Sequence, residues 1–145
     1  MKVALACDHG GIAVKNAVRD WCRARGYEVA DFGTDSPESV DYPDYARLVG
    51  GAVAEGRADR GVLVCTNGIG MCMAANKVHG VRAALVRIPE NAARSRAHND
   101  ANVLCLAGQL DAPPDLAAVL AAWFDTTFEG GRHVRRVDKI MDLEK

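Results

Sequence analysis

The chain has 145 residues, 49% of them apolar and 26% charged, and its 18 basic side chains nearly balance 19 acidic ones. A chain of this size can bury enough apolar surface to fold without disulfides or a structural metal, so we expect one soluble domain over residues 1–145. The apolar runs are far shorter than the roughly 20 residues of a membrane span, and the balanced charge disfavours nucleic acid as a partner.

The cysteines are five in number and include no Cys-x-x-C pair. Because we recognise no secretory signal at the N-terminus, we expect a reduced, cytoplasmic protein in which most thiols are small core residues. The spacing of Cys65 and Cys72 is unlike that of structural zinc pairs, so we expect no metal site.

The first half of the chain alternates short apolar runs with helical patterns. A strand is predicted over 3–7 and a helix from Ile12 to Cys22, where apolar residues recur at helical spacing. Residues 27–32 alternate like a second strand, and a helix is predicted over 45–55. The acidic, turn-rich stretch 35–44 between them is either a lid or a surface loop, and we favour the surface loop. Residues 60–65 have the continuous apolar centre of a strand covered on both faces.

The second half repeats the pattern, with helices predicted over 71–77 and 89–97, strands over 81–86 and 102–106, and final helices over 114–126 and 131–143. This alternation predicts an α/β fold: three Rossmann-like layers, with a five-stranded parallel sheet covered by helices on both faces. Ligands of such sheets bind beyond the carboxyl ends of the strands. We therefore expect the loops after strands one and three to meet there with the segment His98–Asp100.

Cys65 ends the third predicted strand, directly before the loop Thr66-Asn67-Gly68-Ile69-Gly70 that opens a helix. A helix N-terminus stabilises a thiolate, so Cys65 can be a base or a nucleophile, although a buried structural thiol fits its position equally well. The loop's N–H groups can converge on a phosphate or an oxyanion. The loop lacks the third glycine of a dinucleotide fingerprint and the Lys-Ser/Thr of a Walker loop. Met71 stands where a Cys-x5-Arg phosphatase has its arginine, which excludes that class.

Two histidines and two arginines are further candidates. We expect His9 and His98 in loops on the same side of the sheet, and histidine titrates near neutral pH. Asn99 and Asp100 can be explained by helix termination alone. Arg132 and Arg136 lie one helical turn apart, where they form either a phosphate grip or a solvated basic face.

Six motifs in this order and spacing resemble the ribose-5-phosphate isomerase type B and galactose-6-phosphate isomerase family: Cys7-Asp8-His9-Gly10-Gly11, Asp41-Tyr42-Pro43, Cys65-x-x-Gly68-Ile69-Gly70, Ala74-Ala75-Asn76-Lys77, His98-Asn99-Asp100-x-Asn102-Val103-Leu104 and Glu129-Gly130-Gly131-Arg132-His133. The resemblance covers nearly the whole chain. It implies a Rossmann-like aldose-ketose isomerase that needs no metal or other cofactor. It also implies a homodimer or homotetramer with an active site shared between subunits.

The resemblance also implies residue roles. Cys65 would move a proton between C2 and C1 of the open-chain sugar phosphate, by default ribose 5-phosphate, through a cis-enediolate. The backbone of Thr66, Asn67, Gly68, Ile69 and Gly70 would hold the enediolate oxygens. His98 would open the furanose ring, assisted by Asp8. The phosphate ligands would be His9, Arg132 and Arg136, and Asn99 would bind the sugar.

Three positions bear on the match to this family. Asn67 stands where many relatives have threonine, and the neutral Gln109 where many have arginine. Met71 stands where one branch has a glutamate base, so the cysteine branch is the better match. The alternatives are a paralogue for another tetrose, pentose or hexose phosphate, a non-catalytic sugar-phosphate binding module, and a thiol redox sensor that uses Cys65 and Cys72.

Overall fold

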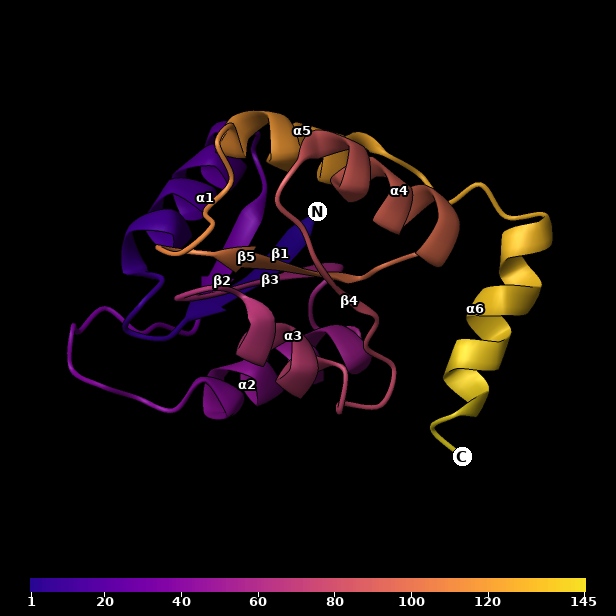
Figure 1. Ribbon diagram of the computed structural model, residues 1–145, viewed down its shortest axis with the longest axis horizontal. Coiled ribbons are helices and arrows are strands. Elements are labelled where there is room, and N and C mark those ends of the chain that lie inside the picture. The colour runs from indigo at the N-terminus through magenta and orange to yellow at the C-terminus, as the bar shows by residue number, and fades with distance from the viewer.

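The computed structural model describes residues 1–145 as a five-stranded sheet with helices on both faces (Figure 1). The strands are β1 (Lys2–Cys7), β2 (Glu28–Asp31), β3 (Arg60–Cys65), β4 (Ala83–Leu85) and β5 (Val103–Ala107). The helices are α1 (Ile12–Ala24), α2 (Tyr42–Ala54), α3 (Ile69–Ala75), α4 (Pro89–Asn99), α5 (Leu116–Asp125) and α6 (Arg132–Asp142). Every strand pair is parallel and the order is β2-β1-β3-β5-β4, which confirms the predicted α/β class.

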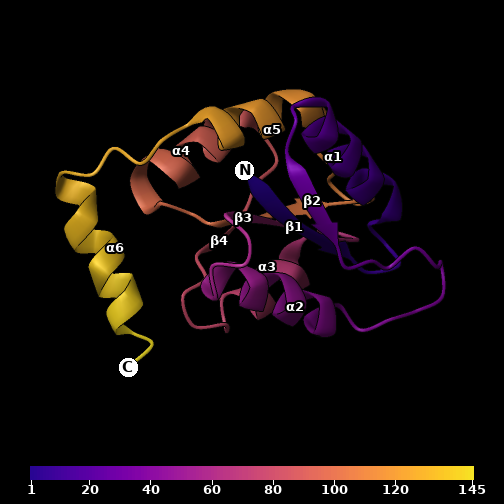
Figure 2. The same cartoon turned by 180° about the vertical axis from the view of Figure 1, so that it is seen from behind.

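The three central strands, β1, β3 and β5, are buried along nearly their whole length because both of their faces are covered. Helices α1, α4 and α5 lie on one face, and α2 and α3 on the other (Figures 1 and 2). The first face packs a core around Leu104 and the fully buried Trp123. The second packs a smaller core around Leu63 and Met71. The small side chains of this second core let α2 and α3 approach the sheet closely.

Helix α6 covers neither face of the sheet and projects from the side of the molecule (Figure 2). Its contacts with other elements are mainly with α4. At its far end the Glu144 carboxylate accepts from the Gly80 N–H at 2.9 and 3.0 Å, which ties the C-terminus to the loop before β4. No helix in the structure combines the length and the apolar character needed to cross a membrane.

Most element boundaries differ from the predictions by one to three residues, each for a local reason. Helix α2 begins at Tyr42 because Pro43 can occupy the first helical turn, where its missing N–H costs nothing. Strand β4 is shorter than predicted because the Arg82 N–H donates to the Asn102 side chain instead of a strand partner. Helix α4 continues to Asn99, so His98 and Asn99 belong to a helix and not to the expected loop.

Candidate active site

The carboxyl ends of β1, β3 and β5 meet at one edge of the sheet, where glycines let their loops touch. Cys65, the last residue of β3, is in register with Ala107 of β5, and the Gly108 N–H donates to the Cys65 carbonyl at 2.7 Å. A Cβ atom at Gly10 would lie 2.1 Å from Thr66 Oγ1, and one at Gly108 would lie 2.4 Å from the Gly10 carbonyl oxygen. Only glycine therefore allows these loops to close. The strand order reverses between β1 and β3, which is where open α/β sheets bind their ligands.

The loop after Cys65 presents unpartnered N–H groups. Gly68 adopts a left-handed conformation with φ of 76°. The N–H groups of Asn67, Gly68 and Gly70 donate no hydrogen bond within the chain, whereas that of Ile69 donates to Asn67 Oδ1 at 3.1 Å. Consecutive free amides in such a turn form a concave binding site for an anionic oxygen. Cys65 directly precedes this loop, and only 4% of the residue is exposed.

Asp8 and His9 follow β1 at the same edge. Asp8 is buried, and its Oδ1 accepts from the Gly10 N–H at 2.8 Å. His9 Nδ1 accepts from the Val40 N–H at 3.2 Å, so the ring proton of neutral His9 lies on Nε2, where it can be donated to an anion. The acidic stretch 35–44, expected to be a surface loop, thus also holds a site residue in place.

A charge cluster around a buried lysine anchors this acidic loop, and the sequence reasoning missed it. Lys15 is completely buried; its Nζ lies 3.0 and 2.9 Å from the two oxygens of Asp31 and 2.7 Å from Asp35 Oδ1. Burial alone would lower the pKa of Lys15, but hydrogen bonds to Asp35 and Asp31 raise it. The same contact lowers the pKa of Asp35. The available signal was a lysine on the buried face of α1, alongside Val18 and Cys22, because a buried cation needs a carboxylate partner.

The predicted position of His98 is wrong. His98 lies in the last turn of α4, which ends at Asn99, and β5 begins after it at Val103. Because β5 runs from there towards the edge that holds Cys65, His98 and Asn99 lie at the opposite, amino edge of the sheet. A segment that precedes a parallel strand always reaches the amino end of that strand. Ligands of such sheets bind at the carboxyl ends, so the segment His98–Asp100, which precedes β5, should not have been placed with the loops that follow β1 and β3.

His98 belongs to a cluster with Glu129 and His133. Its ring stacks on that of His133, with centroids 4.4 Å apart and planes 8° from parallel. The two Nε2 atoms lie 3.8 and 3.5 Å from Glu129 Oε2. Burial and the nearby His98 and Arg132 lower the pKa of His133. Since a metal ion lies in the ring plane of each histidine that binds it, near-parallel rings cannot share an ion without first rotating. The arrangement fits two histidines that share one carboxylate better than a metal site.

Arg132 and Arg136 extend from α6 near the same cluster. Both are exposed and one turn apart, and neither makes an ion pair within the chain. The Glu129 N–H donates to the Ala97 carbonyl at 3.0 Å, which joins the segment before α6 to the end of α4. Figure 1 places α6 at the opposite end of the molecule from the loop between β2 and α2.

The predicted site residues therefore form two separate groups. The carboxyl-edge group consists of Asp8, His9, Cys65, Thr66, Asn67, Gly68, Ile69 and Gly70. The amino-edge group consists of His98, Asn99, Arg132 and Arg136. A single chain does not bring the two groups together. The first offers a thiol and free amides that can bind an anionic oxygen, and the second offers an imidazole and two guanidinium groups that can bind an anion.

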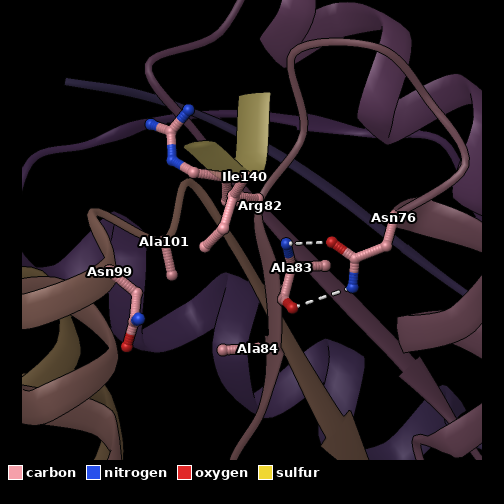
Figure 3. Close-up of a pocket in the computed structure, with 7 residues that line it drawn as sticks. All are labelled: Asn76, Arg82, Ala83, Ala84, Asn99, Ala101 and Ile140. Atoms are coloured by element: carbon pink, nitrogen blue, oxygen red, sulfur yellow. Dashed lines mark hydrogen bonds between the residues drawn. The ribbon is translucent and has the colours of Figure 1, made fainter. Parts of the chain in front are cut away.

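A hollow of about 270 Å³ opens between β4 and α6 (Figure 3), lined by Asn76, Arg82, Ala83, Ala84, Asn99, Ala101 and Ile140. The Asn76 side chain spans its wall: its Oδ1 accepts from the Ala83 N–H at 2.8 Å and its Nδ2 donates to the Ala83 carbonyl at 2.9 Å. Among the predicted site residues, only Asn99 lines this hollow. It therefore borders the amino-edge group and is not the place where Cys65 would meet a ligand.

Comparison with known proteins gives one family. The sequence model described as Ribose/Galactose Isomerase matches residues 3–140. Ribose-5-phosphate isomerase B of Escherichia coli K12 is 42% identical over 144 residues, covering 99% of this chain and 97% of that protein. The D-erythrulose-4-phosphate isomerase of Pectobacterium atrosepticum is 37% identical over 141 residues, covering 97% and 93%.

Solved structures agree over nearly the full length. Ribose-5-phosphate isomerase B of Clostridium thermocellum superposes with a TM-score of 0.95 at 46% identity, covering 99% of this chain and 97% of that one. The Mycoplasma genitalium ribose-5-phosphate isomerase B with bound ribulose-5-phosphate superposes with a TM-score of 0.93 at 39% identity, covering 99% and 95%.

Proposed function

This chain belongs to the ribose/galactose isomerase family and is a sugar phosphate isomerase, and we propose that it interconverts ribose 5-phosphate and ribulose 5-phosphate. The observation that carries the proposal is the buried Cys65 at the end of β3, directly before a loop with three amides that have no partner in the chain. Relatives named for ribose 5-phosphate, one of them with ribulose-5-phosphate bound, support the choice of substrate. In this proposal the whole chain forms a single isomerase domain, acts in the cytoplasm and needs no cofactor.

Cys65 is proposed to act as the base in its thiolate form. The thiolate takes the C2 proton of the open-chain aldose, and the C2–H electron pair forms the C1–C2 double bond of a cis-enediolate with the charge on O1. The free amides of Asn67, Gly68 and Gly70 stabilise that charge as it develops, which lowers the barrier to proton removal. Return of the same proton to C1, with transfer of the O2 proton to O1, gives the ketose. No atom is lost or gained.

Movement of a proton between O1 and O2 needs a group that both donates and accepts. Asn67 Oδ1 accepts from the Ile69 N–H, and an amide NH₂ is too weak an acid to hand over a proton, so the Asn67 side chain can bind a ligand but cannot relay its proton. The hydroxyl of Thr66 retains both capacities. We therefore assign this transfer to Thr66 rather than to Asn67.

Two copies of the chain are needed to complete this site. We propose a homodimer, alone or within a tetramer, in which His98 of the partner subunit faces Cys65. The apolar side chains of Val134 and Ile140 on α6, and of Leu143 just after it, are exposed, and burial against a second copy would account for them. Partner His98 then opens the furanose ring with help from Asp8, partner Asn99 binds a sugar hydroxyl, and partner Arg132 and Arg136 bind the phosphate with His9.

A second substrate class is favoured by one relative and one residue. The D-erythrulose-4-phosphate isomerase is 37% identical over nearly the full length, and Gln109 is neutral where many relatives carry a charge. A shorter sugar phosphate would place its phosphate differently relative to Cys65.

The test is kcat/KM measured in both directions across ribose 5-phosphate, D-erythrulose 4-phosphate, other pentose phosphates and hexose 6-phosphates. We expect ribose 5-phosphate to be preferred and activity to survive treatment with a chelator. A higher kcat/KM for another sugar would replace the substrate, and turnover of none of them would contradict the proposed function.

A further inference from the structure

One arginine stands among the loops that carry the carboxyl-edge group. The loops that follow the five strands cover residues 8–11, 32–41, 66–68, 86–88 and 108–115, and Arg87 is their only lysine or arginine. The nearby Lys15 is buried and bound to two carboxylates, so its charge is not available to a ligand. A phosphate bound at this edge therefore finds one permanent positive charge on the loops of the same chain.

Arg87 lies next to the loop with the free amides. It comes two residues after Leu85, whose Cδ1 would lie 2.5 Å from a Cβ atom added at Gly68. Arg87 Nε lies 2.8 Å from Oδ1 of Asp111, in the loop after β5. That loop also donates from the N–H groups of Gln109 and Leu110 to the Thr66 carbonyl, at 3.0 and 2.9 Å. The Arg87–Asp111 pair thus joins the two loops that flank residues 66–70.

The contact with Asp111 orients the guanidinium without using all of it. The closest approach of the pair is at Nε, the Nη1 and Nη2 groups donate no hydrogen bond within the chain, and the side chain is half exposed. A guanidinium group paired with a carboxylate through Nε still has its two terminal nitrogens for the bidentate contact that phosphate prefers. An ion pair this exposed contributes little to folding, so stability alone gives no reason for its geometry. Asp111 also has a φ of 68°, a conformation that costs free energy in a residue other than glycine.

We propose that Arg87 binds the phosphate of the substrate from the carboxyl-edge group, aimed by Asp111 and acting together with His9. It is a binding residue and not a base, and its charge supplies at this edge what the neutral Gln109 does not. The proposal rests on the proposed function because it takes the phosphorylated sugar as the ligand.

The test compares R87A and R87K with a matched control, R57A. Arg57 Nε lies 2.7 Å from Glu55 Oε2 in an equally exposed ion pair, but this pair precedes β3 and so lies at the amino edge. The probe is inorganic phosphate, measured as a ligand by calorimetry and as a competitive inhibitor of ribose 5-phosphate turnover. Loss of a charged hydrogen bond predicts that R87A weakens phosphate binding and raises KM about 10- to 100-fold. R87K should show a smaller loss, and R57A should behave like the original chain.

Equal phosphate affinity in R87A and R57A would overturn the assignment, as would no measurable phosphate binding by the original chain. Thermal unfolding of each variant checks that the fold is retained, which the exposure of Arg87 leads us to expect. Because calorimetry with inorganic phosphate involves no turnover, this result is independent of the sugar. Lack of turnover of every sugar phosphate would contradict the proposed function instead.

Discussion

The five thiols of this chain lie in different surroundings, and these decide which can react. Burial raises the pKa of Cys7 to about 12 and that of Cys22 to about 11, so both stay protonated at neutral pH. Cys72 is the opposite case: a hydrogen bond from Cys105 lowers its pKa to about 7 despite partial burial. The thiol redox hypothesis paired Cys72 with Cys65, whereas the structure pairs it with Cys105. A thiol-alkylating reagent would modify Cys72 as well, so the role of Cys65 has to be tested by substitution.

The substitution C65A should lower kcat about 10²- to 10⁴-fold, the usual contribution of a positioned base, while the dissociation constant for ribose 5-phosphate changes little. Exchange of the C2 proton with solvent deuterium, followed by NMR, measures the step directly and should cease. The control is C22A, which removes an equally buried thiol in the other core and should retain turnover. Continued exchange in C65A would show that another group is the base.

Sequence alone was sufficient for residues whose role depends on local geometry. A cysteine at the end of an apolar strand, followed by Gly-x-Gly, predicts a loop with free amides, and the structure has one. Lys15 was missed because its partners, Asp31 and Asp35, lie 16 and 20 positions away and come together only in the folded chain. The lowered pKa of Cys72 could not be predicted for the same reason, since it depends on a contact with Cys105 on a strand that is distant in sequence.

At the scale of the elements, the strands and helices were all predicted, because alternating apolar runs and helical spacing report directly on burial. The error lay in assigning the end of one helix to the wrong edge of the sheet. Two features concealed it: α4 has few apolar residues to mark its end, and His98 has the composition of a loop residue. The projection of α6 from the molecule could not be predicted either. In sequence, an apolar helix face that is exposed in one chain has the same pattern as a face that packs against its own chain.

Gly68, the residue that precedes α3, stands at an element boundary with no room for a side chain. A Cβ atom there would meet Leu85 Cδ1 at 2.5 Å and the Leu106 carbonyl carbon at 2.9 Å, at a φ of 76°. We expect G68A to destabilise the fold by roughly 1–3 kcal/mol of overpacking beyond the backbone strain, and to lower kcat by displacing the amides. Urea unfolding measures the first effect. The control is G26A. Gly26 has a φ of 75°, but a Cβ atom there would meet nothing within 4 Å, so this variant has the backbone strain without the overpacking. Equal losses in the two variants would refute the packing argument.

The Lys15–Asp35 pair predicts how stability depends on pH. Because the folded state lowers the pKa of Asp35 below its ordinary 3.8, this group stabilises the fold above about pH 4, and the effect is lost as pH falls through the folded pKa. D35N should therefore melt at a lower temperature than the original chain at pH 6, and the difference should shrink below pH 4. Melting curves from pH 3 to 7 measure this, with D138N as a control that removes an exposed carboxylate without a partner. A difference independent of pH would contradict the ion pair.

For the whole molecule, the main consequence is that two incomplete groups lie at opposite ends of one chain. Mixing two inactive variants, C65A and H98N, after reversible unfolding should restore activity. Random pairing makes half of the molecules mixed dimers, each with one intact site of two, so about 25% of the original activity is expected for an isologous pair. Mixing C65A with D8N should restore none, because both changes lie in the same group. Recovery in both mixtures, or in neither, would contradict a shared site.

The side chain of Asn76 has an effect well beyond the hollow it lines. By occupying both hydrogen-bonding groups of Ala83, it takes up part of the outer rim of β4. Cys72 covers more of this three-residue strand, because its Sγ lies 3.6 Å from the Ala83 carbonyl oxygen and, besides the hydrogen bond from Cys105, one from the Leu85 main chain lowers its pKa. An uncovered rim is where a sixth strand from another molecule could add and begin an open-ended fibre. Asn76 and Cys72 thus cover the β4 edge, so a strand from another molecule could add there only after their contacts with the main chain were broken.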